Sequence, residues 1–175
     1  TRAESILTIQ SGGWDTAEGS VRAKDPNPLA PFKWFAVTDL DRPSLVTATI
    51  EVPEHSEEFG IAIHANDDFT EAYLVRFEPA RSRFVFDRRP HRIDVPFDHD
   101  VDRSYVSDPD FEIERPLDSA RSSHDVVVIV EGSCISIYID DVALTTRGYD
   151  LAEGQLGFYV AGPSLTVSAI EVSKR

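Results

Sequence analysis

The sequence has no methionine, a single cysteine, and 17 lysine and arginine residues against 31 aspartates and glutamates. With only Cys134 present, an internal disulfide is excluded. The formal net charge of −14 argues against nucleic acid or an anionic membrane as partner, because phosphate recognition needs clustered basic side chains. No segment approaches the run of about 18 apolar residues that a membrane span requires. The chain is still long enough to bury about 70% of its unfolded surface in one core.

Catalytic and metal-binding motifs are also missing. There is no Gly-x-Ser-x-Gly elbow and no glycine-rich loop that opens a helix. The histidines lack metal-ligand spacing, and we expect them to be solvated; they are His55, His64, His91, His99 and His124. Carboxylates are abundant, but abundance alone does not indicate a glycosidase pair, which is defined by its separation in space.

Short β-branched and aromatic runs recur along the chain, separated by Gly, Pro, Asp and Ser. This pattern is typical of a β-sandwich or barrel. The clearest hairpin spans 124–140. Its first strand, 126–130, is apolar on both faces and predicts a central strand covered on two sides. Isoleucines then alternate with polar residues over 135–139, which predicts a half-buried partner strand.

A second hairpin is predicted over 71–88, with its turn at 78–82. Alternation places Tyr73 and Arg76 on opposite faces of its first strand. We find no convincing helix beyond one short turn at 116–122. The segments 11–31 and 91–110 are rich in Pro and Asp and are interpreted as long loops of a single domain, 1–175. Further strands are predicted at 4–10, 33–39, 44–52, 59–65, 155–161 and 164–173.

Two kinds of ligand site are weighed from the residues. Asp98, Asp100 and Asp102 alternate in the second loop, so a structural Ca²⁺ site is an alternative to the plain acidic loop that we expect. We expect no other cofactor. Sugar binding needs an aromatic platform with polar side chains that hold hydroxyl groups. The alternative for the aromatics is a place in the core or on a sheet surface; they are Trp14, Trp34, Tyr73, Tyr138 and Tyr159.

Several segments together resemble one known family. They are FGIAIHA at 59–65, DD at 67–68, EAYLVRFEPARSRFVFDR at 71–88, ERPL at 114–117, VEGSCISIYIDD at 130–141 and LTTRGY at 144–149. Their order and turn spacing resemble the C-terminal sandwich of glycoside hydrolase family 32, whose members split β-fructosides such as sucrose, levan and inulin. The resemblance covers residues 44 to 173, whereas the first forty residues match poorly.

The resemblance implies a concanavalin-like jelly roll beside a five-bladed β-propeller that carries the catalysis. KDPNP at 24–28 is only superficially similar to the first propeller motif, and the other two are missing. This sandwich is also similar to carbohydrate-binding module family 66, which binds the terminal fructose of levan. The resemblance therefore implies a non-catalytic accessory module that supports the propeller and binds fructan or terminal fructose.

If the module binds sugar, we expect the pocket to combine polar groups at strand ends with an aromatic ring. The candidates are Glu71, Tyr73, Arg76, Asp87, Arg88, Arg115 and Trp34. Two alternatives stay open. One is a stand-alone lectin-like domain with Ca²⁺, and the other is a small jelly-roll glycan hydrolase. The sequence does not indicate a cellular compartment, and the chain is expected either in the cytoplasm or secreted together with its parent enzyme.

Overall fold

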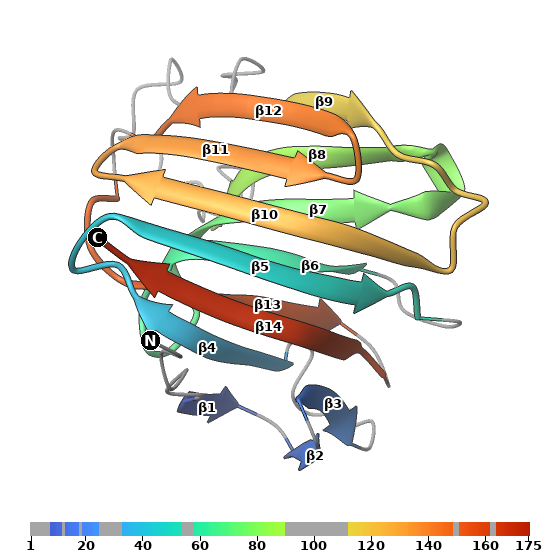
Figure 1. Ribbon diagram of the computed structural model, residues 1–175, viewed down its shortest axis with the longest axis horizontal. Helices are drawn as coiled ribbons and strands as arrows, with labels where there is room; N and C mark the ends of the chain where they lie inside the picture. The colour runs from blue at the N-terminus through green and yellow to red at the C-terminus, as the bar shows by residue number, and fades with distance from the viewer. Residues whose placement is uncertain are drawn as a thin grey trace, which may run out of the picture.

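The computed structural model describes residues 8–11, 13–17, 19–24, 33–53, 58–89, 112–148, 151–161 and 164–175. Within them the chain forms two antiparallel seven-stranded sheets, which lie face to face as a β-sandwich (Figure 1). This described part contains no α-helix, and its only helical turn is the 3-10 turn η1 (Pro79–Arg81). The predicted all-β sandwich of two antiparallel sheets is confirmed.

Each sheet combines strands from distant parts of the chain. Sheet A has the order β1 (Thr8–Ser11), β4 (Lys33–Asp39), β13 (Gln155–Ala161), β6 (Glu58–Ala65), β7 (Ala72–Glu78), β8 (Arg83–Arg89), β9 (Ile113–Pro116). Sheet B has the order β12 (Val142–Arg147), β11 (Cys134–Ile139), β10 (Ser123–Glu131), β5 (Ser44–Glu51), β14 (Thr166–Lys174), β3 (Ser20–Lys24), β2 (Gly13–Ala17). Sheet B faces the viewer in Figure 1.

The core lies between the sheets and follows from the two-residue period of the strands. In β5 the inward residues Val46, Ala48 and Ile50 are buried, while the residues between them are half-buried. From sheet A, Ile61 and Val75 meet them with no exposed surface. Full burial of a side chain of this size stabilises the fold by about 1.5–3 kcal/mol.

Both predicted hairpins are confirmed. In the β7–β8 pair, Phe77 lies opposite Phe84 and both side chains are in the core. In the β10–β11 pair, Val128 lies opposite Ile137, again with both inward. Asp140 takes the left-handed backbone conformation (φ 52°) in the tight turn that leads into β12.

Two predictions about the strands were wrong. The segment 11–31 is not simply a loop, because β2 and β3 form a hairpin within it at the edge of sheet B. The strand β10 is central, but it is not covered on both sides. Its outward residues Val127 and Ile129 are only half-buried, and no third layer lies over them among the described residues.

The histidines that the structure describes also contradict the prediction of solvated side chains. His64 is 3% exposed and His124 is fully buried. The Nδ1 atom of His124 lies 2.8 Å from Oδ2 of Asp140, and Arg121 reaches the other oxygen of that carboxylate at 3.2 Å. His124 therefore ties the first residues of β10 to the β11–β12 turn.

The second predicted loop, 91–110, and the Ca²⁺ alternative at Asp98, Asp100 and Asp102 lie outside the described residues. Within the described ranges, no three His, Cys, Asp or Glu side chains are arranged to hold a metal ion. The same part of the chain has no helix long and apolar enough to cross a membrane.

Candidate functional site

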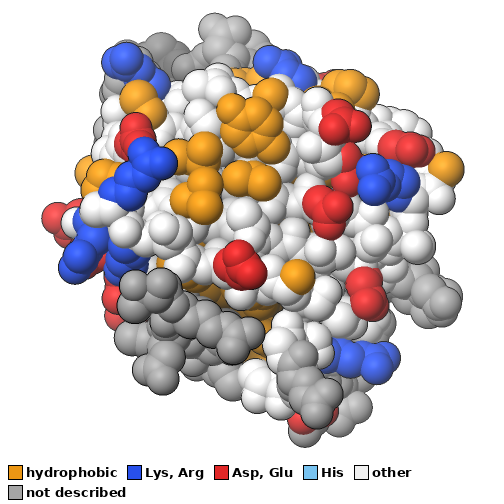
Figure 2. Space-filling model, in the orientation of Figure 1, with side chains coloured by type: hydrophobic (Ala, Val, Ile, Leu, Met, Phe, Trp, Pro, Cys, Tyr) orange, Lys and Arg blue, Asp and Glu red, His pale blue; other side chains and the backbone are white. Residues whose placement is uncertain are grey.

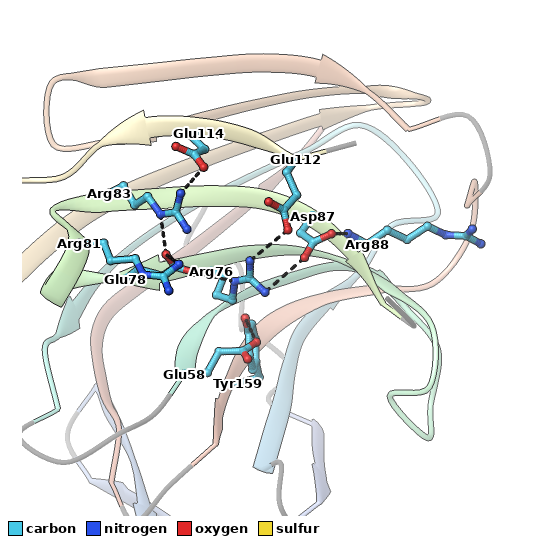
Figure 3. Close-up of polar contacts among 10 residues, drawn as sticks. All are labelled: Glu58, Arg76, Glu78, Arg81, Arg83, Asp87, Arg88, Glu112, Glu114 and Tyr159. Carbon is cyan, nitrogen blue, oxygen red and sulfur yellow. Dashed lines mark hydrogen bonds and ion pairs between the residues drawn. The ribbon is translucent and has the colours of Figure 1, made fainter. Parts of the chain in front are cut away.

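The candidate site is the outer face of sheet A, the side turned away from sheet B. One lane of directly opposed residues crosses four strands there, in the order Trp34, Tyr159, Gly60 and Arg76. Aromatic side chains gather at the first end of the lane. Ion-paired side chains gather at the other end (Figure 3). The two groups are called the aromatic half and the charged half of the site.

Arg76 is the centre of the charged half. Its Nη1 lies 3.3 Å from Oδ2 of Asp87, its Nη2 lies 3.6 Å from Oε1 of Glu112, and its Nε lies 3.3 Å from Oε1 of Glu78 (Figure 3). The side chain of Asp87 is only 5% exposed, whereas those of Arg76 and Glu112 are 17% and 38% exposed. The carboxylates have further donors as well, because the backbone N–H of Arg88 donates to Oδ1 of Asp87 at 2.7 Å.

A row of ion pairs continues from this cluster toward the sheet edge. Arg83 bonds Glu78 through Nε and Glu114 through Nη1, and Arg81 lies 3.5 Å from Glu78. Because Glu78 of β7, Arg83 of β8 and Glu114 of β9 alternate in charge across the three strands, the row holds the edge strand β9 to the sheet. Ion pairs near solvent contribute little individually to the free energy of unfolding. The row therefore serves mainly to position its side chains.

Tyr159 joins the two halves. Its hydroxyl donates a hydrogen bond of 2.9 Å to Oε1 of Glu58, whose strand β6 lies between β13 and β7. Burial raises the pKa of the Tyr159 phenol well above its ordinary value, and the negative charge of Glu58 raises it further. Arg76 opposes part of this increase. Tyr159 therefore stays a neutral donor, so Glu58 is held in one orientation.

The aromatic half is built around Phe69. Its ring stacks on Trp34 with centroids 5.3 Å apart and meets Tyr159 at 5.5 Å. Leu74 and four alanines of the surrounding strands complete the cluster, and all its members are buried. Trp34 is thus covered by its own chain, which makes it part of the floor of the face.

The turn that carries Phe69 is fixed by its own polar groups. Asn66 accepts from the backbone N–H of Glu71 at 2.9 Å and donates to the Thr70 hydroxyl at 2.8 Å. The same hydroxyl donates to Asp68 at 2.6 Å. Phe69 itself has a positive φ of 56°, a conformation that is uncommon for a bulky residue. The hydrogen bonds around it hold the ring over Trp34.

Gly60 lies between the halves and is itself buried. An added Cβ at this position would lie 1.9 Å from the carbonyl oxygen of Val75. Since no side chain fits there, glycine is what allows the strands β6 and β7 to approach each other closely at this point of the lane.

The structure brings together only some of the predicted site residues. Arg76 and Asp87 meet on the outer face of sheet A, and Trp34 lies at the other end of the same lane. Tyr73 is on the opposite face, as predicted, where its buried hydroxyl accepts from the N–H of Leu151 at 3.2 Å.

The side chains of the remaining predicted residues lie away from this cluster, and Arg88 contacts it only through its backbone N–H, which donates to Asp87. Arg88 and Arg115 are register partners of Tyr73 and Phe84, whose side chains face the core. The guanidinium of Arg88 points away from Arg76 (Figure 3). Glu71 is exposed in the turn before β7.

The site also contains residues that were not predicted as members, among them Glu58, Phe69, Glu78, Glu112 and Tyr159. Glu58 and Glu112 carry no local signal, because only the strand order places them beside Arg76. Tyr159 was named as an aromatic candidate but was left out of the final set. Its signal was available, since the alternation in β13 puts Phe158 inward and Tyr159 on the outer face.

The arrangement is suited to binding a polyhydroxylated ligand. Carboxylate oxygens accept hydrogen bonds from hydroxyl groups, and charged partners make such bonds about twice as strong as neutral ones. Glu58 and Glu112 supply acceptors and Arg76 supplies donors, while the buried Asp87 orients Arg76 from below. The acidic surplus disfavours a phosphate or a uronic acid at this face.

Comparison with solved structures shows how widespread this fold is. A carbohydrate-binding module CBM66 from Bacillus subtilis matches with a TM-score of 0.68 and 12% identity, over 97% of this chain and 96% of that one. An exo-inulinase from Aspergillus awamori matches with a TM-score of 0.54 and 18% identity, over 98% of this chain but 30% of the enzyme. The galectin LEC-6 of Caenorhabditis elegans matches with a TM-score of 0.51 and 14% identity, over 87% and 95% of the two chains.

At these identities the similarities show the fold alone. No curated protein matches the sequence. The sequence does match the family model described as glycosyl hydrolases family 32 C terminal, over residues 16–174. This match begins at residue 16 and not at residue 44, so residues 16–43 fit the family better than predicted. With nearly the whole chain covered, this protein belongs to the family of C-terminal domains of the family 32 glycosyl hydrolases.

Proposed function

We propose that this chain is the non-catalytic accessory module of a β-fructoside-splitting hydrolase, and that it binds the terminal fructose of fructans on the outer face of sheet A. The observation that carries the proposal is the cluster of Arg76, Asp87 and Glu112 beside the Tyr159–Glu58 pair. These groups come from five strands or their flanking residues, so the fold holds them in place without a ligand.

Two features support a sugar as the ligand. The charged half reaches solvent, with Glu112 38% exposed as a hydroxyl acceptor and Arg76 17% exposed as a donor, while the buried aromatic half holds the strands beside it in place. The matching module from Bacillus subtilis is named a carbohydrate-binding module, and its chain is matched over nearly its full length.

The accessory role is supported by the family itself, since its C-terminal domain is the non-catalytic part of these hydrolases. The chain spans about a third of the exo-inulinase that it matches. We therefore propose that a catalytic propeller of the same parent protein is its partner. Incubation of the isolated chain with sucrose, levan or inulin should release no reducing sugar. Release of fructose would instead favour a small jelly-roll hydrolase.

Calorimetric titration with fructose, levan and inulin tests the sugar site. We expect heat of binding for the native chain, and at least about a tenfold loss of affinity in Arg76→Lys, because lysine lacks the planar fork that engages two acceptors. The matched control is Arg147→Lys, an exposed arginine on the edge strand of sheet B, which should bind like the native chain.

Two results would contradict this proposal. No heat at millimolar sugar would leave only the role of supporting the propeller. Equal affinities for the native chain and Arg76→Lys would place the sugar elsewhere. Circular dichroism of each variant separates a lost contact from a lost fold.

A further inference from the structure

The strand β12 forms one edge of sheet B, and no other described strand pairs with its free side. The N–H of Gly148, just after β12, donates to the carbonyl oxygen of Ser133 at 2.8 Å, which sets the phase of the ladder between β12 and β11. Because bonded and non-bonded pairs alternate in an antiparallel ladder, every second residue of β12 bonds to β11. The N–H and C=O groups of the others point out of the edge, and these residues are Ala143, Thr145 and Arg147.

Of the four edge strands in the two described sheets, β12 is the most open to pairing. It has six residues, VALTTR, without proline or lysine, whereas β1, β2 and β9 have four, five and four residues. The strand β9, the neighbouring edge of sheet A, ends in Pro116 and exposes Glu114 and Arg115. Short length, proline and charge are features that keep an edge unpaired, and β12 has fewer of them.

A second copy of this chain fits the free edge, because β12 is complementary to itself. A two-fold axis perpendicular to the sheet at Leu144 sets two β12 strands antiparallel, with Leu144 opposite Leu144 of the second copy. In that register Ala143 and Thr145 of the second copy exchange both of their backbone hydrogen bonds, and the axis repeats the exchange. The free N–H and C=O groups of one edge therefore meet those of the other.

The same register pairs opposite charges. Asp141 is exposed in the turn before β12, and Arg147 is exposed at the end of the strand. With the axis at Leu144, Asp141 comes opposite Arg147 of the second copy, and the pair recurs at the other end of the contact. Opposite charges directly across two strands stabilise their pairing. A register centred on Thr145 puts Arg147 opposite Ala143 instead and loses both pairs.

The surroundings of the edge are compatible with this contact. Figure 2 shows hydrophobic side chains gathered over the upper part of the outer face, where Figure 1 places β11 and β12. The contact extends an uncharged surface, since Tyr138 beside Ala143 is continued by Thr145 and Ser136 of the second copy. The net charge of −14 repels two copies at a distance, but at about 0.15 M salt charges more than about 8 Å apart are largely screened.

We propose that two copies of this chain associate through β12, so that sheet B continues across the pair as one antiparallel sheet. The two-fold axis keeps each core face inward, and both copies then direct the outer face of sheet A to the same side. If that face binds fructan, the pair presents two sugar sites to one polymer, although the dimer itself does not depend on the proposed function. One edge strand makes a small interface, so the association is weak and reversible.

Sedimentation velocity of this chain at increasing concentration, in about 0.15 M NaCl, tests the contact. We expect a monomer–dimer equilibrium that Thr145→Pro weakens at least about tenfold, because proline removes an edge N–H without touching the ladder to β11. The matched control is Thr16→Pro on β2, the opposite edge of sheet B, where Thr16 is also exposed. This variant should dimerise like the native chain.

Exchange of the charged pair tests the register and leaves the backbone intact should Thr145→Pro fail to fold. Arg147→Asp and Asp141→Arg should each weaken the dimer about tenfold, and the double variant should restore it. Circular dichroism checks the fold of every variant. A chain that stays monomeric at every concentration would overturn the proposal. So would a dimer that Thr16→Pro weakens and Thr145→Pro does not, or a double variant as weak as the single ones.

Discussion

At the scale of single residues, Gly60 shows how a missing side chain shapes the site. Gly60→Ala would place a methyl group against the backbone of Val75, so β6 and β7 would separate. We expect a loss of about 1–3 kcal/mol in the free energy of unfolding, as for other overpacked positions. Urea unfolding followed by circular dichroism measures it.

The control for this substitution is Gly19→Ala. Gly19 has a φ of +82° and no atom within 4 Å of an added Cβ, so it tests backbone conformation without a clash. A cost at Gly60 that does not exceed the cost at Gly19 would show that the strands tolerate the extra atom.

His64 gives the fold a dependence on pH. Burial lowers the pKa of its imidazole below the ordinary value of 6.5, and the nearby backbone of Gly132 and Glu153 opposes part of the shift. The folded state therefore binds fewer protons than the unfolded chain. The stability contributed by neutral His64 is present above the unfolded pKa and is lost as the pH falls below it.

We expect the urea midpoint of the native chain to fall between pH 7.5 and pH 5.5, and to fall less in His64→Asn. Asparagine does not titrate in this range and tolerates the positive φ of 53° at this position. The comparison of the two slopes is the measurement. Parallel slopes would assign the pH dependence to other groups.

At the scale of elements, the turn 66–71 decides whether the aromatic half exists. Asn66→Ala removes two side-chain hydrogen bonds that fix the turn, to Glu71 and Thr70. We expect a loss of about 1–3 kcal/mol in the free energy of unfolding, because a typical net hydrogen bond contributes about 1 kcal/mol. The control is Asp67→Ala in the same turn, which is exposed and should change stability by less than about 0.5 kcal/mol. Equal effects would mean that packing of Phe69 alone holds the turn.

The elements also show which parts of the fold the sequence could predict. The hairpins at 71–88 and 124–140 were predictable because alternation is strong where one face is buried. The strand β2 was missed because it lies at a sheet edge, where Asp15, Thr16 and Ala17 are all exposed and no period of two remains. The strand β3 does alternate, with Val21 and Ala23 buried and Arg22 exposed, but it is only five residues long.

Only the contacts of the site that form within one hairpin could be predicted from the sequence. Arg76 and Asp87 face outward on adjacent strands of one hairpin, so alternation alone puts them on the same side. Glu58 and Tyr159 are 101 positions apart and meet only through the order of the strands in sheet A. Arg88 and Arg115 were chosen by residue type, and their register placed them on the other face.

At the scale of the whole molecule, the excess of acidic side chains should lower the stability of the folded state. A net charge of −14 repels itself most in the compact state, and salt screens this repulsion. We expect the melting temperature at pH 8 to rise by a few degrees when NaCl is increased from about 50 to 500 mM. The increase should shrink near pH 5, since the pI of the sequence is about 4.6. An equal increase at both pH values would point to a general effect of the salt on burial.

The last two strands of the chain enter the middle of different sheets. β13 lies between β4 and β6 in sheet A, and β14 lies between β5 and β3 in sheet B. During translation, β4, β5 and β6 therefore leave the ribosome long before their central partners are made. A product that stops before residue 155 keeps strands with unpaired edges in both sheets, and such edges are sites of aggregation. Sheet A can therefore be completed only after β13 has been translated, and sheet B only after β14 has been translated.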